Sequence, residues 1–274
     1  MQKILFYKMS ASGNDFILID DRNKGLDSEG IRPFVQQVCR RRFSVGADGL
    51  ILIESSTRAH FKWRFFNADG SEAEMCGNGG RCVAKLAHLL GIAPAQLSFE
   101  TQAGIIQAEV TTTGVKLKMT EPYNLRPQID LSLKDRSIQG GFINTGVPHL
   151  VCLVDDLAKY PVVEVGKQIR FHPEFSPAGT NADFVKIISP DRIAIRTYER
   201  GVEDETMACG TGAIASALMA SVWKGMGSPV AVETYGGEVL TIFFQRTGEG
   251  FSEVYLEGPA KVIYQGYLWE EALK

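Results

Sequence analysis

The sequence predicts an α+β fold built from two halves of similar topology. A cysteine followed by glycine opens an expected helix twice, at Cys76 and at Cys209. The apolar spacing behind both cysteines is helical, and strand-like segments stand at matching distances before and after both of them. A repeated group of this kind indicates two related domains. A chain of 274 residues is long enough to bury one large core or two smaller ones.

In the first half, a strand expected at Phe61–Phe66 leads into the motif Glu74–Gly79. Behind the motif, apolar residues follow one another at roughly helical intervals up to Gly91, which closes the helix: Val83, Leu86, Ala87, Leu89 and Leu90. Residues 100–104, which begin with Glu-Thr and end with glycine, predict a turn between two short strands.

The second half repeats this order. A strand expected at Arg192–Thr197 leads into the motif Met207–Gly212. The helix behind it has the same kind of spacing, with Gly225 beyond its end: Ile214, Ala215, Leu218, Met219 and Val222. The turn at residues 233–237 follows Cys209 at the distance at which residues 100–104 follow Cys76. A shorter echo pairs Asn14-Asp15-Phe16 with Asn181-Ala182-Asp183-Phe184.

The halves are expected to divide near Glu121-Pro122, a pair that Glu257-Gly258-Pro259 echoes near the end of the chain. We expect the last residues to pair back with the first half. The predicted domains are therefore residues 1–121 with about 263–274, carrying Cys76, and residues 122–262, carrying Cys209.

Composition excludes several classes of protein. A formal net charge of −3 provides no basic field for nucleic acid. No stretch is apolar enough for a signal sequence or a membrane span, so we expect a cytoplasmic protein. Five cysteines, an odd number without framework spacing, are typical of a reducing compartment.

The repeat places each motif cysteine directly before a helix. There the helix dipole and the free backbone N–H groups stabilise an anion, which lowers the pKa of a thiol. If the halves pack about a pseudo-twofold axis, the two cysteines meet in the cleft between them. Inversion of a stereocentre needs one group to remove a proton and another to return one on the opposite face. This arrangement therefore indicates a racemase or epimerase. It favours a catalytic role for the repeated cysteines over a gene duplication that affects the structure alone.

No cofactor is expected. The four histidines are scattered along the chain, and the spacing from Cys76 to Cys82 is not that of a zinc knuckle. Neither a metal site nor a lysine that marks a pyridoxal phosphate site is evident. The helix N-termini can replace such a cofactor, because N–H groups at Gly77, Asn78, Gly210 and Thr211 can hold an α-carboxylate and stabilise the charge that develops there.

Four blocks of sequence resemble the diaminopimelate epimerase family: Ser12–Phe16, Asn67–Cys82, Gly179–Asn181, and Glu199–Gly201 with Ala208–Gly212. The resemblance implies domains in which a curved mixed or antiparallel sheet, a β-roll, surrounds a central helix. It implies epimerisation of LL-diaminopimelate and meso-diaminopimelate, in lysine and peptidoglycan precursor biosynthesis, by a homodimer. Diaminopimelate would then be the small-molecule substrate.

Carried over residue by residue, the resemblance makes Cys76 and Cys209 the acid/base pair. His149 and Glu199 would adjust the thiol pKa values. The helix ends Gly77-Asn78 and Gly210-Thr211 would bind the α-carboxylate, and further residues would surround the substrate: Asn14, Asn67, Asn181, Glu199 and Arg200. Cys39, Cys82 and Cys152 are expected to be packed thiols without a catalytic role.

Three positions depart from the family pattern. Val147 replaces a common asparagine, Gly49 replaces a glutamine, and the loop 202–206 is one residue longer. The nearest alternative is a proline or hydroxyproline racemase of the same fold, in which Asn67, Asn181 and Arg200 would have no distal partner. A cysteine hydrolase with His149 as base would leave the second cysteine unexplained. A non-catalytic binding module would leave both cysteines unexplained.

Overall fold

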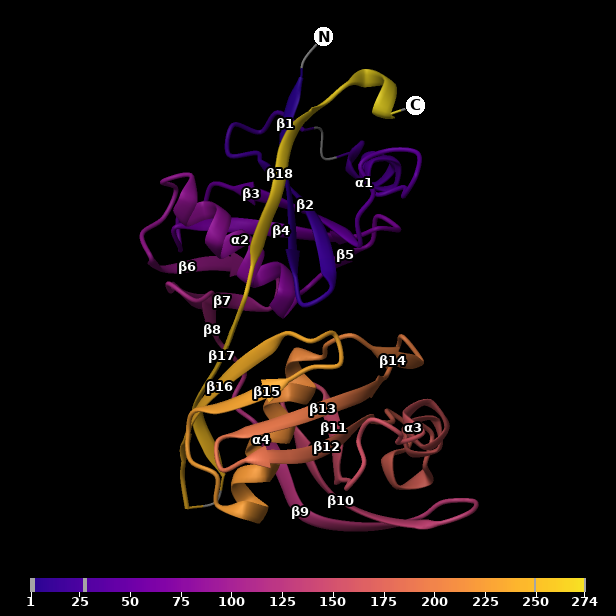
Figure 1. Ribbon diagram of the computed structural model, residues 1–274. Helices are drawn as coiled ribbons and strands as arrows, with labels where there is room; N and C mark the ends of the chain where they lie inside the picture. Colours follow the sequence, from indigo (N-terminus) through magenta and orange to yellow (C-terminus); the bar gives the residue numbers. More distant parts are fainter. Residues whose placement is uncertain (1–2, 27–28, 249, 274) are drawn as a thin grey trace. The chain divides into compact units, whose positions relative to one another are not determined.

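The computed structural model describes residues 3–26, 29–248 and 250–273 (Figure 1). The chain forms two compact units: unit 1 is Met1–Leu117 with Gly258–Lys274, and unit 2 is Lys118–Glu257. The first boundary lies slightly before the predicted Glu121. The return to unit 1 comes at Gly258 rather than near residue 263, because pairing with the first strand already begins at Lys261.

In its described residues, unit 1 contains two helices and one short 3₁₀ segment among its strands. The helices are α1 (Ile31–Val38) and α2 (Gly77–Leu89), and the 3₁₀ segment is η2 (Glu270–Leu273). Its strands are β1 (Ile4–Ala11), β2 (Asn14–Asp20), β3 (Gly49–Glu54), β4 (Phe61–Asn67), β5 (Glu72–Ala73), β6 (Gln96–Thr101), β7 (Gly104–Val110), β8 (Val115–Lys118, ending at the boundary) and β18 (Lys261–Leu268).

Unit 2 has the same kind of content. Its helices are α3 (Val162–Arg170) and α4 (Gly210–Lys224), with the 3₁₀ segment η1 (Pro173–Phe175). Its strands are β9 (Tyr123–Ser132), β10 (Ser137–Asn144), β11 (Pro148–Leu153), β12 (Asn181–Ser189), β13 (Arg192–Glu199), β14 (Asp204–Thr206), β15 (Val230–Glu233), β16 (Val239–Arg246) and β17 (Phe251–Gly258, ending at the boundary).

The two units share one strand topology. In unit 1, β2 and β3 are parallel, β3 and β4 antiparallel, β4 and β6 parallel, and β6 and β7 antiparallel. In unit 2 the same sequence of pairings runs through β11, β12, β13, β15 and β16. Helix α2 follows β5 as α4 follows β14. The predicted α+β class with two halves of similar topology is therefore confirmed.

The echo between Asn14–Phe16 and Asn181–Phe184 does not reflect this equivalence. Asn14 begins β2, whose counterpart in unit 2 is β11, whereas Asn181 begins β12, the counterpart of β3. Both segments nevertheless start a strand of a parallel pair. The interpretation of the echo as part of the repeat was wrong.

Both predicted helices begin directly after their cysteine and end before their glycine. Cys76 is the N-cap of α2 and Cys209 is the N-cap of α4. Gly91 and Gly225 adopt φ values of 69° and 68°, in the left-handed region that glycine enters without steric cost. These glycines therefore end the two helices where the sequence predicted.

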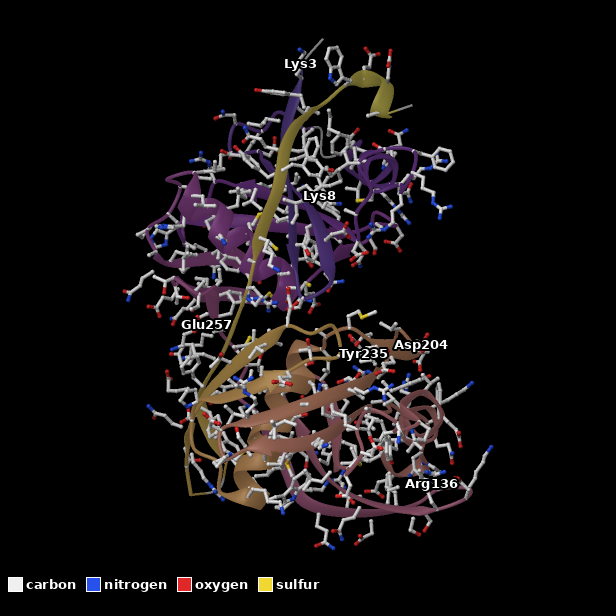
Figure 2. All side chains as sticks on the ribbon, viewed as in Figure 1. Lys3, Lys8, Arg136, Asp204, Tyr235 and Glu257 are labelled. Carbon is white, nitrogen blue, oxygen red and sulfur yellow. The ribbon has the colours of Figure 1, made fainter. Side chains whose placement is uncertain are left out.

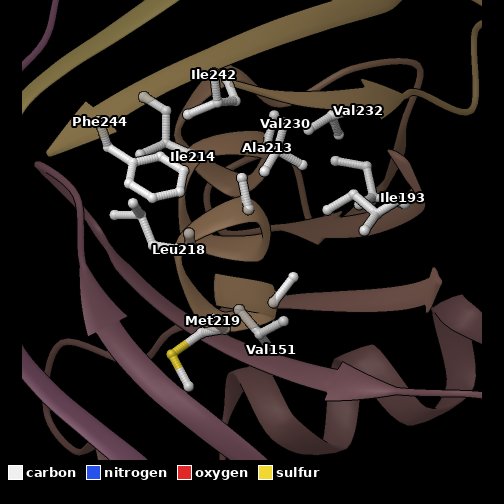
Figure 3. Packing of buried hydrophobic residues seen from close by; sticks show 14 of the residues in the cluster. Val151, Ile193, Ala213, Ile214, Leu218, Met219, Val230, Val232, Ile242 and Phe244 are labelled. Carbon is white, nitrogen blue, oxygen red and sulfur yellow. The ribbon is translucent and has the colours of Figure 1, made fainter. Parts of the chain in front are cut away.

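Helix α4 forms the centre of the unit 2 core (Figure 3). All residues from Gly212 to Ser221 are buried. Ile214 and Leu218 pack together with Ile242 and Phe244 of β16 in one apolar cluster. A helix that is apolar on every side is stable in water only when it is surrounded in this way. In the described part of the chain, no helix is long and apolar enough to span a membrane.

Candidate active site

In unit 1, Cys76 lies at the N-terminus of α2. Its backbone is extended, with φ −146° and ψ 118°, and its Sγ accepts a hydrogen bond from the Gly79 N–H at 3.5 Å. The thiol is half-buried. A Cβ atom added to Gly77 would have no neighbour within 4 Å, so the first residue of the helix borders open space. An anion can therefore approach the N–H groups of this helix end.

Asn78 and Asn14 belong to one hydrogen-bonded network at this helix end. Asn78 Nδ2 donates to Asn14 Oδ1 at 2.6 Å, and Asn14 Nδ2 donates to Asp48 Oδ2 at 3.1 Å. The fully buried Arg81 donates from Nη2 to Asn78 Oδ1 at 2.9 Å and to Ser12 Oγ at 2.7 Å. The structure thus brings together two predicted site residues, Asn14 and Asn78, and links them to three that were not predicted.

Asp48 also belongs to a cluster of ion pairs that includes Arg41, Asp15 and Lys8. Arg41 Nη2 lies 2.8 Å from Asp48 Oδ1 and also bonds Asp15, and Lys8 Nζ lies 2.7 Å from Asp15 Oδ2. Lys8, on β1, is buried and also donates to the Gly46 carbonyl (Figure 2). Burial acts to raise the pKa of Asp15, but hydrogen bonds from Arg41 and Lys8 outweigh it and lower that pKa to about 2.

Asn67 ends β4 and is exposed, and its Nδ2 donates to Ser71 Oγ at 3.0 Å. Its register partner on β3 is Gly49. A Cβ atom at Gly49 would lie 2.6 Å from the Phe66 carbonyl oxygen and 2.7 Å from the Phe65 ring. Gly49, which departs from the family pattern, therefore fits its surroundings, because this strand pair leaves no room for a side chain in its present conformation.

In unit 2, Cys209 is more deeply enclosed than Cys76. It is 6% exposed, and its Sγ lies 3.4 Å from Thr211 Oγ1. Burial raises the pKa of Cys209 above its ordinary value, and the negative charges of Glu199 and Asp183 raise it further. Hydrogen bonds from Thr211 and the Gly212 N–H act in the opposite direction but are outweighed. The helix N-terminus thus acts on the Cys209 pKa in the expected direction, but burial and the two carboxylates raise the pKa by more.

His149 is part of a buried network centred on Asp183. His149 Nδ1 and Asp183 Oδ2 are 2.7 Å apart, and both side chains are completely buried. Thr197 Oγ1 donates to Asp183 Oδ1 at 2.7 Å. Asp183 also packs against the first turn of α4, where a Cβ at Gly212 would lie 2.3 Å from Oδ1. The carboxylate accepts the Nδ1 proton of the ring and so fixes the ring's orientation.

Asn181, at the start of β12, connects this network to Arg200. Its Nδ2 donates to the Pro148 carbonyl at 3.0 Å and lies 3.5 Å from His149 Nε2, while its Oδ1 accepts from the Arg200 N–H at 2.7 Å. The Arg200 guanidinium donates to the Ala178 carbonyl at 3.1 Å. Asn181 thus has Arg200 and His149 as neighbours: Arg200 and Asn181 were predicted to bind substrate, and His149 to adjust the thiol pKa values.

Glu199 ends β13, and its Oε2 accepts a hydrogen bond from Thr206 Oγ1 at 3.0 Å. Burial raises the pKa of Glu199 above its ordinary value. Thr206 belongs to β14, which the longer loop 202–206 forms by pairing back onto β13, with Asp204 opposite Glu199. The loop therefore contributes a strand and a hydrogen-bond donor to this site. At the other departure, the Val147 carbonyl accepts from the Thr145 N–H at 3.1 Å.

The remaining cysteines are buried within their units. Cys39, Cys82 and Cys152 are at most 4% exposed, and burial raises the pKa values of Cys39 and Cys152 to about 12. None of the five cysteines, all of which are described, forms a disulfide. Within the described ranges, no three histidine, cysteine, aspartate or glutamate side chains are grouped as metal ligands.

Sequence reasoning missed four residues that organise the site: Arg81, Asp48, Asp183 and Thr197. Arg81 lies within the block Asn67–Cys82 and Asp183 within the segment Asn181–Phe184, but their sequence context alone indicates no role for either. A charged residue inside an otherwise apolar helix or strand is a usable signal, because such a residue is buried only with partners.

Comparison with known proteins adds independent information. A sequence model of the diaminopimelate epimerase family matches residues 6–125 and 141–263. The chain is 48% identical to the diaminopimelate epimerase of Aquifex aeolicus, over 98% of this chain and 99% of that protein. It is 43% identical to the diaminopimelate epimerase of Chlorobaculum tepidum, over 94% of this chain and 98% of that protein.

Solved structures share the fold at much lower identity. A PhzF-family phenazine biosynthesis protein of Bacillus anthracis aligns with a TM-score of 0.71 and 17% identity, covering 98% of this chain and all of the other. A hydroxyproline epimerase of Agrobacterium vitis aligns with a TM-score of 0.66 and 14% identity, covering 98% of this chain and 93% of that one. Similarity at this level concerns the fold alone.

Proposed function

The chain belongs to the diaminopimelate epimerase family, and from this premise we propose that Cys76 and Cys209 are its two acid/base groups. The enzyme is an isomerase of lysine biosynthesis that interconverts LL-diaminopimelate and meso-diaminopimelate. The observation that carries the proposal is that each cysteine caps the N-terminus of the equivalent helix in two units of the same topology. In this proposal, meso-diaminopimelate also supplies peptidoglycan precursors.

The proposed chemistry is a proton transfer on opposite faces of one α-carbon. The thiolate of one cysteine removes the α-proton, and the electron pair of the broken C–H bond moves toward the α-carboxylate. The thiol of the other cysteine then delivers its proton to the opposite face. The backbone N–H groups of Gly77-Asn78 and Gly210-Thr211 stabilise the charge on the carboxylate, which is the term that usually contributes most to such reactions.

The polar residues of both units provide the remaining contacts in this proposal. Arg200 binds the distal carboxylate with two parallel N–H donors, and the amides of Asn14, Asn67 and Asn181 make further hydrogen bonds to the substrate. Glu199 binds the α-ammonium group. A proline-type racemase needs no distal contacts of this kind, so this set also favours diaminopimelate over the alternative with the same fold.

His149 and Glu199 adjust the thiols in the proposed mechanism. Burial and the negative charges of Glu199 and Asp183 raise the pKa of Cys209, which favours its protonated form before substrate binds. His149, whose Nδ1 is bound to Asp183, has a fixed ring orientation, with Nε2 3.5 Å from Asn181 Nδ2.

The proposed function is tested by incubating the reduced, metal-free protein with LL-diaminopimelate in deuterated water. We expect meso-diaminopimelate that carries deuterium at the inverted α-carbon, because the delivered proton comes from a thiol that has exchanged with solvent. The measurement is mass spectrometry of the separated isomers. Folded, reduced protein that yields meso product without deuterium would contradict proton transfer through solvent-exchanged thiols.

We further propose a homodimer formed through β18 and a cytoplasmic location. Strand β18 pairs with β1 and exposes large apolar side chains along its length: Val262, Ile263, Tyr264 and Tyr267. Leu5 and Tyr267, which are cross-strand partners, are 37% and 57% exposed. Such an exposed apolar edge is typical of an interaction surface. Five cysteines without a disulfide favour the reducing cytoplasm.

Substituting Ile263→Glu is expected to convert the dimer to a monomer, because it places a charge in the apolar surface of β18. The molar mass is measured by size-exclusion chromatography with light scattering. Phe171→Glu, at a residue of unit 2 that is 59% exposed, is the matched control and should leave the mass unchanged. An unchanged dimer in the Ile263 variant would exclude this surface as the interface.

A further inference from the structure

We propose that Arg81 is a positioning residue which, together with Asp48, fixes the orientation of the Asn78 and Asn14 side-chain amides. The consequence for the substrate rests on the proposed function, in which both asparagines contact diaminopimelate. The orientation itself follows from unit 1 alone.

Four side chains form one directional chain of hydrogen bonds. Arg81 Nη2 donates to Asn78 Oδ1 at 2.9 Å, and Asn78 Nδ2 donates to Asn14 Oδ1 at 2.6 Å. Asn14 Nδ2 then donates to Asp48 Oδ2 at 3.1 Å. Every bond has the same sense, from the cation to the anion.

The charged ends determine this sense. A guanidinium group only donates hydrogen bonds, so the Asn78 atom that faces Arg81 must be its oxygen. An ionised carboxylate only accepts, so the Asn14 atom that faces Asp48 must be its nitrogen. Flipping either amide would set two N–H groups or two oxygens against each other. The middle bond, from nitrogen to oxygen, satisfies both ends at once.

Both ends are themselves held in place. Arg81 is completely buried, and it also donates to Ser12 Oγ at 2.7 Å and from Nε to the Pro259 carbonyl at 3.3 Å. Arg41 Nη2 donates to Asp48 Oδ1 at 2.8 Å, so a positively charged guanidinium lies next to the negatively charged carboxylate. Charge-assisted bonds of this kind are stronger than those between neutral groups.

This chain of hydrogen bonds determines which atoms of the two amides can still bind substrate. The oxygens of Asn78 and Asn14 are each occupied by one donor, whereas each Nδ2 has a second N–H that the chain does not use. These N–H groups add to the backbone donors of the α2 N-terminus, which is capped by Cys76. We therefore infer that this side of the site selects a carboxylate of the substrate and disfavours an ammonium group.

The first test reverses one end of the chain. Asp48 is exposed, so Asp48→Asn should fold normally. Because Arg41 only donates, the new amide must turn its oxygen to Arg41 and its nitrogen toward Asn14. That nitrogen then meets the Asn14 nitrogen, and the chain is in conflict with Arg81. The second variant, Arg81→Gln, removes the charge at the other end, and the double variant combines both.

Lys85→Met is the matched control. Lys85 lies on α2 one turn beyond Arg81, and its Nζ donates to the Ala260 carbonyl at 2.7 Å, next to the carbonyl that Arg81 binds. The control removes a comparable contact with the segment that returns to unit 1, but it leaves the amide chain intact. It therefore separates positioning of the amides from anchoring of that segment.

The expected kinetic result is a rise in KM for diaminopimelate of about tenfold in Asp48→Asn, with little change in kcat, since about one hydrogen bond to a charged group is lost. Arg81→Gln should give a similar rise, and the double variant should add little to either, because both break the same chain. Lys85→Met should keep the KM of the native enzyme. Unchanged KM in folded Asp48→Asn, or an equal rise in Lys85→Met, would overturn the proposal.

A second readout does not depend on catalysis. In nitrogen-15 NMR spectra of the native protein, the Nδ2 protons of Asn14 and Asn78 that lie in the chain should exchange slowly with deuterated water, and exchange should accelerate in Asp48→Asn but not in Lys85→Met. Fast exchange of these protons in the native protein would contradict the proposed chain of hydrogen bonds. Slow exchange in a protein that fails to epimerise diaminopimelate would instead place the failure with the proposed function.

Discussion

Substituting either Cys76→Ala or Cys209→Ala is expected to reduce epimerisation in both directions by at least about a thousandfold. A positioned acid or base contributes roughly a hundredfold to ten-thousandfold to a rate, and inversion needs both groups in every turnover. A thousandfold loss corresponds to about 4 kcal/mol in the activation barrier. The rates are measured from LL-diaminopimelate and from meso-diaminopimelate, with fold and reduction state checked for each variant.

Cys39→Ala and Cys152→Ala are the matched controls for these two variants. Both thiols are buried, and burial raises the pKa of each to about 12, so neither supplies a thiolate near neutral pH. Both controls should fold and remain active. Near-normal turnover in either the Cys76 or the Cys209 variant would contradict the two-base mechanism, because one thiol would then be dispensable.

Substituting Asp183→Ala is expected to lower the free energy of unfolding by about 3 to 5 kcal/mol. The change leaves completely buried His149 without its partner at Nδ1 and removes the acceptor of the Thr197 hydroxyl. Breaking a buried pair on one side has a cost of this size. The measurement is urea unfolding at neutral pH. A loss of less than about 1 kcal/mol would show that His149 finds another partner or that water replaces the carboxylate.

Thr197→Val is the reference variant against which the loss of stability in Asp183→Ala is compared. It removes one neutral hydroxyl from the same carboxylate, keeps the shape of the side chain, and should cost only about 1 kcal/mol. If the two variants were equally destabilising, the His149 contact would contribute nothing beyond an ordinary hydrogen bond. The Asp183 variant should also lose activity even where it is folded, because the ring of His149 is then free to change its tautomer.

The architecture could be predicted from the sequence because the residues that mark the repeat determine the local backbone structure. A cysteine before a helix, the helical spacing behind it and a glycine with positive φ at its end each specify a short segment without tertiary contacts. Since both halves carry these signals at equal spacing, their common topology follows. The echo at Asn14 and Asn181 failed because short polar strand starts are too common to identify equivalent strands.

The network of the site was beyond this kind of reasoning. Arg81 and Asp48 act on Asn78 and Asn14 across strands and a helix, and such contacts depend on how the elements pack. The pKa of Cys209 shows the same limit. The local signal, a helix N-terminus, predicts a lowered value, whereas burial and the carboxylates of Glu199 and Asp183 raise it.

The pairing of β1 with β18 determines the order in which the two units can be completed on the ribosome. Ile4 to Ser10 find their partners between Lys261 and Leu268, so the sheet of unit 1 lacks a strand until nearly the whole chain has been synthesised. Unit 2 is a single continuous segment and has all of its residues by Glu257. The half that is translated first is therefore the half that finishes folding last, the reverse of the usual vectorial order in proteins with consecutive domains.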